Sequence, residues 1–410
     1  MDDPQSVTMH PPLHGIRVLD LTRLLPGPYA GHMLAELGAD VIKVEDPAQG
    51  DGARATAPFA ASSAVGFAAI NAGKRSIALN LKAAAGREAF LRLVDGADIL
   101  LEGFRPGTLA RLGLAHDSLL ERNPRLIVCA LTGYGQDGPY RLRAGHDLNY
   151  MGYAGLLAQL ARPGEAPHAP GMQIADVAGG ALMAIIGMLA ALVARGVSGR
   201  GQVVDVAMLD GCMALAPRDM AFAAAGVGDT DPGIGRLNGA LPCYHTYETA
   251  DGRAVTLAAL EAKFWAEFCR RVGRPDLEPR QAPRDDRERD ATIAELAALF
   301  RTKTRDEWVA LLAATDSCVG PVNTLAEAQA DPQVRARGLL LAGADGAPRV
   351  RSVPRMSAAP SRALGPAPEL GEHTGAVLAE AGYTPDEIAA LLAAGAAQGA
   401  TARGAPSPAE

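Results

Sequence analysis

The sequence predicts an α/β protein, with a Rossmann-like parallel sheet in a large domain and a second, smaller α+β domain. Short apolar stretches alternate with helical patterns through residues 16–131, which is typical of a parallel sheet covered on both faces. Residues 225–240 are rich in Gly and Asp and predict a linker, and two strands around an Asp-Gly turn follow it. With 48% apolar and 21% charged residues, the chain of 410 residues has the composition of a globular protein.

The strands expected for the large domain are short and apolar, at 16–23, 40–45, 76–82, 98–104 and 125–131. Helical patterns lie between them, from the turn at 25–28 to Leu37, at 83–94 and at 107–122. The turn after the first strand reads R-L-L-P-G-P, whereas a dinucleotide-binding turn needs G-x-G-x-x-G so that the backbone can approach a pyrophosphate. We therefore expect the layered architecture without an NAD site.

Residues 177–215 predict one or two long apolar helices that are broken near 196–202, where the sequence reads G-V-S-G-R-G-Q. The uncharged run 177–194 approaches the length of a membrane span. It is rich in Gly and Ala and has no second span to pair with, so we expect a core helix and no membrane.

The smaller domain is expected to contain two strands within 243–259, followed by helices at 262–272, 291–300 and 305–314. From about 331 the chain is polar and Pro-rich, up to a helix at 384–393. These patterns predict domain segments at 1–224, 225–330 and 331–397, and a disordered tail at 398–410.

Charge and cysteine usage exclude several classes of protein. A net charge of −7 without a basic run argues against nucleic-acid binding. The N-terminal residues MDDPQSV lack the basic and apolar regions of a signal peptide, so we expect a cytoplasmic protein. Five scattered cysteines without a C-x-x-C pair indicate neither a zinc site nor a disulfide framework.

Three polar side chains stand where an apolar residue would be expected. His146 follows a glycine-rich segment, Asp176 begins the apolar run at 177–194, and Glu261 interrupts an apolar strand end. Taken singly, they could be a structural histidine, a helix cap and a surface residue. Together, a histidine and a carboxylate can move a proton on and off one carbon from opposite faces. A further carboxylate can orient the imidazole and fix its tautomer.

Several longer segments resemble the class III CoA-transferase superfamily, and the resemblance covers nearly the whole chain. They include HGIRVLDLTRLLPGPYAGHMLAELGADVIKVE, NAGKRSIALNLK, LLEGFRPGTLARLGL, TGYGQDGP, QIADVAGG, SGRGQVVDVAMLDG and GEHTGAVLAEAGY. Within the superfamily, GHDLNY and TDSCVGPV are most similar to the alpha-methylacyl-CoA racemase branch.

This resemblance implies roles for the three polar residues. His146 and Asp176 would exchange the roles of acid and base through an enolate, and Glu261 would orient His146. In the transferases of the superfamily, the Asp matching Asp176 is instead a nucleophile that attacks the thioester. Racemases usually carry Asn four residues before this Asp, whereas here that position is Met172, followed by Gln173. The transferase reaction is therefore the alternative, and a CoA-binding scaffold without activity is a further one.

The resemblance also implies that CoA arrives as part of an acyl-CoA thioester, with no separate cofactor and no metal. The residues that match the family's CoA contacts are Leu24, Lys43, Asn80, Lys82, Arg105, Arg111, Asp147 and Tyr150. Lys and Arg suit CoA phosphates as a point charge and a fork, respectively, although any one of these cations could be an ordinary surface residue.

The family fold is an interlocked homodimer, in which each subunit is threaded through the other. Its large domain is built from both chain ends and its small domain is inserted between them. The active site lies between the large domain of one subunit and the small domain of the other, so Glu261 would reach His146 across the interface.

Lysine usage gives a further hint, because only five of the 39 basic residues are lysine. A GC-rich coding bias explains the excess of arginine. Three of the five, Lys43, Lys74 and Lys82, fall in segments that receive the CoA nucleotide in the family. We expect Lys43→Ala to weaken CoA binding, most strongly at low salt, if Lys43 contacts a phosphate.

Overall fold

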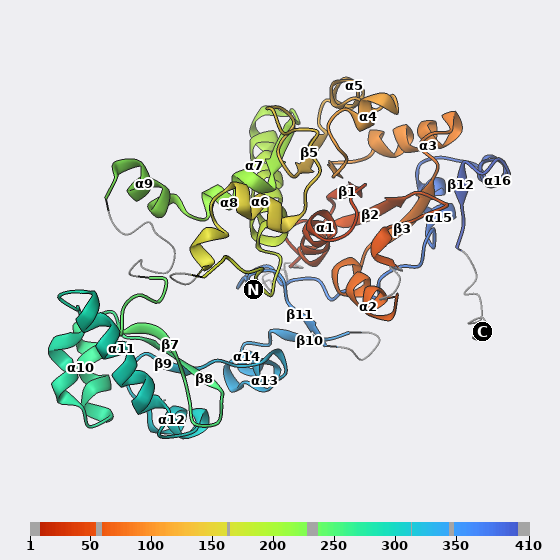
Figure 1. Cartoon of the computed structure of the whole chain (residues 1–410). Coiled ribbons are helices and arrows are strands. Elements are labelled where there is room, and N and C mark those ends of the chain that lie inside the picture. The colour runs from red at the N-terminus through yellow and green to blue at the C-terminus, as the bar shows by residue number, and fades with distance from the viewer. Residues whose placement is uncertain are drawn as a thin grey trace, which may run out of the picture. The chain divides into compact units, whose positions relative to one another are not determined.

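The computed structural model describes residues 9–54, 60–161, 165–227, 237–312, 314–343 and 348–400, and the side chains of 60–63 fall outside this description. The chain divides into two compact units. The larger unit consists of Met1–Ala154, Met172–Leu215 and Gly338–Glu410, and the smaller unit of Gly155–Gly171 and Ala216–Arg337 (Figure 1). The domain boundaries predicted from the sequence stay predictions.

A seven-stranded sheet organises the larger unit, in the order β12-β3-β2-β1-β4-β5-β6. All neighbouring strands are parallel except β12, which pairs antiparallel with β3. The strands are β1 (Arg17–Asp20), β2 (Asp40–Glu45), β3 (Arg75–Leu79), β4 (Ile99–Glu102), β5 (Ile127–Thr132), β6 (Val203–Ala207) and β12 (Ala397–Gln398). The order from β3 to β6 is that of a Rossmann sheet, so the prediction of a parallel-dominated α/β fold is confirmed.

Helices cover both faces of this sheet. They are α1 (Pro26–Glu36), α2 (Ala60–Asn71), α3 (Ala84–Asp95), α4 (Thr108–Arg111), α5 (His116–Arg122), α6 (Asp147–Tyr153), a π-helix η3 (Ala175–Leu182), α7 (Met183–Ser198), α8 (Met208–Ala214), α15 (Thr374–Glu380) and α16 (Pro385–Ala393). A 3₁₀ turn η1 (Gly52–Arg54) and a hairpin of β10 (Leu340–Ala342) and β11 (Pro348–Val350) complete the unit.

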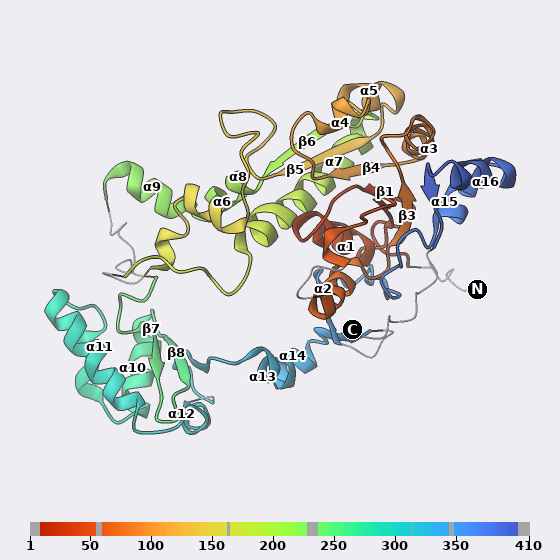
Figure 2. The ribbon, with the colours of Figure 1, turned by 45° about the vertical axis from the view of Figure 1, so that its right-hand side comes forward.

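The two faces of the sheet have different coverings. Leu19, Ile42 and Ile77 on one face pack with residues of α3, α4, α5, α15 and α16 in one core cluster. Helices α1 and α7 lie against the other face. Figures 1 and 2 show α15 and α16 beside α3, next to the β3 edge. All residues of β4 and β5 are buried, which explains why these segments are apolar without alternation.

Three sequence-based expectations for this unit were wrong in detail. Residues 203–207 form strand β6 rather than helix, because their β-branched valines pair with β5 after Gly199 ends α7 in a left-handed conformation. The helix expected at 107–122 is two helices separated at Gly113, which has a φ of 75°. Gln398, the first residue of the predicted disordered tail, lies in strand β12 and pairs with Ala78 of β3. Residues 401–410 of that predicted tail lie outside the described residues.

The apolar helix of the sequence is continuous from Ala175 to Ser198, and by length and composition alone it could cross a membrane. One side packs in the larger unit through Ala184, Ile185 and Met188. The opposite side leaves Ile186, Val193 and Val197 exposed, at 59%, 73% and 91%. The expected core helix is therefore buried on one side only.

The smaller unit contains a three-stranded antiparallel sheet, β7-β8-β9. Its elements are η2 (Ala158–Leu160), α9 (Pro217–Ala225), β7 (Tyr244–Glu248), β8 (Ala254–Ala258), α10 (Ala262–Arg271), η4 (Pro275–Arg280), α11 (Asp286–Phe300), α12 (Arg305–Leu312), β9 (Val319–Pro321), α13 (Leu325–Ala330) and α14 (Pro332–Ala336). Its core is aromatic, with Trp265, Phe268, Phe300 and Trp308 packed together. The two strands and three helices expected here are present.

Candidate functional site

A cavity of about 480 Å³ opens at the carboxyl edge of the large sheet. Its walls come from residues 21–27 after β1, 103–106 after β4 and 131–134 at the end of β5. Strands β1 and β4 are neighbours in the sheet. Beyond β1 the chain adds β2 and β3 on one side, and beyond β4 it adds β5 and β6 on the other. In open α/β sheets, ligands bind outside the carboxyl ends of the strands at such a switch point.

Asp176 lies in this cavity, in the first turn of the π-helix η3. Its backbone N–H donates to Asp147 Oδ1 at 2.9 Å. Burial and, to a smaller extent, the nearby Asp147 raise the pKa of Asp176 to about 6, and His146 opposes both effects. A carboxyl group with this pKa can both accept and release a proton near neutral pH. Asp147, expected near the CoA arm, thus acts on Asp176 and does not line the cavity.

Close helix packing fixes the start of η3. Glycines at 179 and 211 lie so near one another that a Cβ on Gly211 would stand 2.0 Å from the carbonyl oxygen of Gly179. Any side chain there would push α8 and η3 apart. Helix α8 packs directly on the backbone of η3, and this contact explains why the apolar segment after Asp176 is rich in Gly. π-helical turns are frequent at functional sites.

His146 lines the same cavity as Asp176, at the start of α6. Its backbone N–H donates to Asn149 Oδ1 at 3.0 Å, which holds the helix start. Tyr150 packs behind it and donates its hydroxyl to the carbonyl oxygen of Gly145 at 2.5 Å. A Cβ on Gly133 or Gly145 would collide with the Tyr150 ring, which explains why glycine precedes His146. The structure thus brings the two predicted bases to one cavity.

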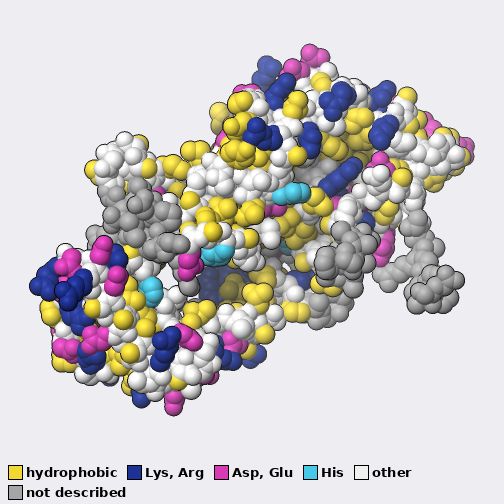
Figure 3. All heavy atoms as spheres, in the orientation of Figure 1, with side chains coloured by type: hydrophobic (Ala, Val, Ile, Leu, Met, Phe, Trp, Pro, Cys, Tyr) yellow, Lys and Arg dark blue, Asp and Glu magenta, His cyan; other side chains and the backbone are white. Residues whose placement is uncertain are grey.

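Arginines supply most of the charged side chains of the cavity wall, and only Arg105 among them was predicted from the sequence. The arginines that line it are Arg23, Arg105, Arg141 and Arg143. The guanidinium of Arg143 stacks 4.0 Å from the centroid of Tyr140 and donates to the Tyr153 hydroxyl. Arg141 and Arg143 flank a leucine just before the G-H-D motif, and this closeness to His146 was an available signal. Figure 3 shows further Lys and Arg side chains around α4 and α5.

The sequence model of CoA-transferase family III matches residues 13–374 of this chain. The chain belongs to CoA-transferase family III.

Proteins named for two different activities resemble this chain. Alpha-methylacyl-CoA racemase of Mus musculus is 36% identical over 382 residues, 92% of this chain and 96% of that protein. Succinate–glutarate CoA-transferase of Agrobacterium fabrum is 39% identical over 393 residues, 90% of this chain and 96% of that protein. A CAIB/BAIF family protein from Brucella suis has a solved structure with a TM-score of 0.77 and 35% identity, covering 91% of this chain and all of the other.

The residues predicted from the sequence resemblance to contact CoA divide into two groups. Leu24, Arg105 and Tyr150 line the cavity. Asn80 and Lys82 follow β3, where the Lys82 N–H donates to Asn80 Oδ1 at 3.1 Å, and Arg111 donates to Thr108 Oγ1 at 2.9 Å. These three, like Lys43, are not among the residues that line the cavity. Lys43 is fully buried.

Glu261 belongs to the smaller unit, where it is exposed and immediately precedes α10. Its carbonyl oxygen accepts the N–H groups of Phe264 and Trp265 at 3.0 and 3.1 Å. Its role toward His146 stays a prediction. Within the part of the chain that the structure describes, no group of three or more His, Cys, Asp or Glu side chains is placed to hold a metal ion.

Proposed function

We propose that this member of CoA-transferase family III is an acyl-CoA racemase or epimerase that acts at the α-carbon of 2-methyl-branched thioesters. The observation that carries the proposal is the pair of His146 and Asp176 on one cavity. An imidazole and a carboxyl group of raised pKa can each work as acid or base near neutral pH. The racemase relatives from two mammals, at 36% and 34% identity, support this choice.

The reaction needs one proton to leave the α-carbon and another to return from the opposite face. In one direction, the Asp176 carboxylate removes the α-proton, and the thioester becomes an enolate. Protonated His146 then delivers its proton to the other face of the carbon. In the reverse direction, neutral His146 is the base and protonated Asp176 is the acid. Arg105 and the other cavity arginines would hold the anionic CoA moiety during both steps.

The pKa of Asp176 gives a prediction for the two stereoisomers. For the isomer whose proton Asp176 removes, kcat/KM should fall tenfold per pH unit well below pH 6, because the carboxylate becomes protonated. The other isomer should show the same fall, because both directions use the same pair of bases with one proton between them, and the equilibrium constant between the isomers does not depend on pH. Stereochemically pure substrates assayed between pH 5 and 9 measure both profiles. A kcat/KM that stays constant as the pH falls through 6 would contradict an acid–base role for Asp176.

The proposal is tested by α-proton exchange. A 2-methylacyl-CoA is incubated with the protein in deuterated water, and deuterium at the α-carbon is followed by mass spectrometry. We expect exchange with the wild type and none above background with the His146→Ala plus Asp176→Ala double variant. A wild type that exchanges no faster than this variant would exclude the racemase activity. A panel of acyl-CoA thioesters in the same assay would identify the acyl group.

A CoA-transferase is the second candidate, supported by the 39% identical transferase from Agrobacterium fabrum and by Met172 in place of the racemase Asn. The Asp176 carboxylate would attack the thioester carbonyl and expel the CoA thiolate, which leaves a mixed anhydride. Hydroxylamine added during turnover with a donor acyl-CoA and an acceptor acid would trap this anhydride. A mass shift on the peptide that contains Asp176, together with absence of α-proton exchange, would favour the transferase.

We further propose an interlocked homodimer in the cytoplasm, with the smaller domain inserted between the two parts of the large one. The exposed apolar stripe of Ile186, Val193 and Val197 on α7 supports burial against a second copy. Glu261 of the partner subunit would then orient His146. No nucleic acid or membrane takes part in this proposal.

A further inference from the structure

The loop after β1 contains a strained residue in the wall of the cavity. Leu24 has a φ of 66°, and among the described residues only Leu24 and Cys318 adopt a positive φ without being glycine. A branched side chain in this left-handed region is unfavourable and persists only where its surroundings enforce it. Leu24 is 52% exposed and lines the cavity, so its own side-chain packing does not supply this enforcement.

Asp51 holds the Leu24 backbone from the side away from the cavity. The Leu24 N–H donates to Asp51 Oδ1 at 3.0 Å, and the same oxygen accepts the Ala53 N–H at 2.9 Å. The Asp51 carboxylate is buried and follows β2 by six residues. It is not among the residues that line the cavity, so it acts there only through Leu24.

Lys43 in turn holds Asp51 and a second point of the same loop. Its Nζ lies 2.8 Å from Asp51 Oδ2, and both side chains are fully buried. The ammonium also donates to the carbonyl oxygen of Thr22 at 2.9 Å. Lys43 on β2 stands beside Asp20 on β1 in the parallel register, which aims its side chain along the end of β1. The buried ion pair of Lys43 and Asp51 therefore fixes the loop at two points through hydrogen bonds to the backbone of Thr22 and Leu24.

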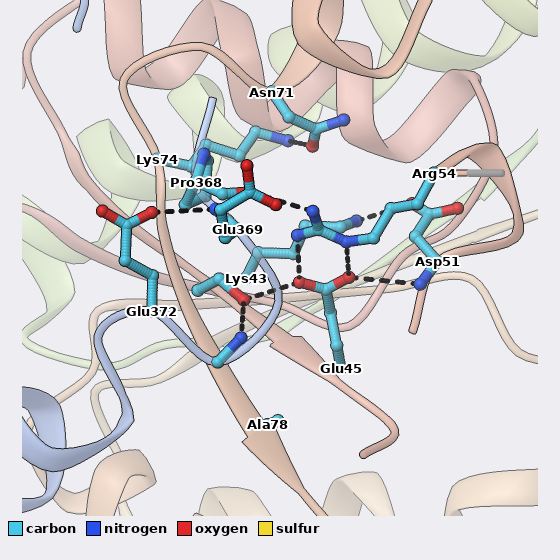
Figure 4. Close-up of polar contacts among 12 residues, drawn as sticks. Lys43, Glu45, Asp51, Arg54, Asn71, Lys74, Ala78, Pro368, Glu369 and Glu372 are labelled. Carbon is cyan, nitrogen blue, oxygen red and sulfur yellow. Dashed lines mark hydrogen bonds and ion pairs between the residues drawn. The ribbon is translucent and has the colours of Figure 1, made fainter. Parts of the chain in front are cut away.

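Neighbouring groups keep this ion pair in place. Asp20 Oδ1 accepts the Thr22 N–H at 2.9 Å, and Asp20 Oδ2 pairs with Lys74 Nζ at 2.9 Å. Figure 4 shows Arg54 and the Asp51 backbone converging on the Glu45 carboxylate, with the Arg54 Nε at 2.8 Å and the Asp51 N–H at 3.1 Å. These contacts fix the peptide that carries Asp51 as well as its side chain.

We propose that Asp51 and Lys43 are positioning residues, which hold Leu24 in its left-handed conformation as a wall of the acyl-CoA site. The inference rests on the proposed function of that cavity. It assigns Lys43 a role through the backbone, in place of the phosphate contact expected from the sequence. Because the ammonium is buried and paired with Asp51, its effect on CoA binding should not depend on salt.

The test is a cycle of variants that measures how the effect of Asp51 depends on Leu24. Asp51→Asn keeps the size and an acceptor oxygen but removes the charge, and Leu24→Gly removes the side chain that opposes a positive φ. Free CoA is titrated calorimetrically into each protein. We expect Asp51→Asn to raise the Kd for CoA about tenfold in the wild-type background, the size of one lost charge-assisted hydrogen bond. In the Leu24→Gly background, the same change should raise the Kd less than about threefold.

Equal factors in the two backgrounds would overturn the proposal, because Asp51 would then act independently of Leu24. Titrations of Lys43→Met at low and high salt test the other part. We expect a salt dependence equal to that of the wild type, whereas a weaker salt dependence in the variant would show a direct phosphate contact and contradict the positioning role.

Hydrogen exchange gives a readout that needs no ligand. The Leu24 amide should exchange faster in Asp51→Asn than in the wild type, while amides of the smaller unit keep their rates. Unchanged exchange at Leu24 would contradict the inference. If the wild type binds no CoA at all, the proposed function fails, whereas the exchange of the Leu24 amide still decides whether Asp51 holds the loop.

Discussion

Asp176→Asn should lower the rate of interconversion of the two stereoisomers by about 10²–10⁴-fold, the usual contribution of a positioned general acid–base group. The asparagine keeps the shape of the side chain but can neither take the α-proton nor return it. His146→Gln should cause a loss of the same order in both directions of the reaction. The rate at which each pure stereoisomer is converted into the other measures both effects.

The stability of the Asp176→Asn protein is the matched control. Burial raises the pKa of Asp176 in the folded state to about 6, so the folded state favours the protonated form. The ionised carboxylate therefore reduces stability as the pH rises from the unfolded pKa through 6, and this penalty is complete at pH 8. We expect the asparagine variant to melt at or above the wild-type temperature at pH 8. Activity within tenfold of wild type would remove Asp176 from the mechanism.

His146→Gln also separates the two candidate activities. Anhydride formation at Asp176 needs no proton transfer from the α-carbon, so a transferase should keep trapping by hydroxylamine in this variant. A racemase should lose interconversion of the two isomers and show no trapping in either protein. A His146→Gln variant that interconverts the isomers at the wild-type rate would contradict the two-base mechanism.

Lys74→Met should reduce the free energy of unfolding by about 3–5 kcal/mol, because it leaves the Asp20 carboxylate buried without its partner. Both side chains are fully buried, and Lys74 Nζ also donates to the carbonyl oxygen of Pro28 and to Asn71 Oδ1. Burial lowers the pKa of Lys74 to about 8 even though Asp20 opposes this shift. The ammonium therefore depends on Asp20 to remain charged at neutral pH.

The double variant Lys74→Met plus Asp20→Asn should recover more than half of this loss. The asparagine carries no charge and still offers an oxygen to the Thr22 N–H, which Asp20 accepts in the wild type. Urea denaturation of the wild type, the two single variants and the double variant gives the coupling energy. Additive effects would show that the two residues stabilise the protein independently.

Strand and helix positions could be predicted well where local pattern and tertiary packing agree. Strand β2 has the predicted bounds because its apolar residues lie between Asp40 and Glu45 at a sheet interior. Strand β6 was missed because its valines continue an apolar run, and only pairing with β5 makes that run extended. The antiparallel partner of β3 lies at the other end of the chain, beyond the reach of any local pattern.

The proposed catalytic residues of the candidate site could be predicted from the sequence, but the buried residues that position its walls could not. His146 and Asp176 stand out because polar residues interrupt glycine-rich and apolar segments. Lys43 is likewise a polar residue within an apolar segment, yet its ammonium faces Asp51 rather than the cavity. A sequence shows that a lysine lies in a strand, but not whether a carboxylate eight residues later folds back onto it. The retained lysines at 43 and 74 are explained in this structure by buried ion pairs.

The pairing of β12 with β3 has a consequence for synthesis of the chain on the ribosome. Leu79 lies opposite Ala397, so the β3 edge of the sheet lacks this partner strand until residues 397–398 have been synthesised. During that interval the nascent larger unit exposes an unpaired, apolar strand edge, which is a template for association with other chains. Completion of the sheet therefore waits for residues 397–398 to emerge, and a chain terminated before them would retain an aggregation-prone edge.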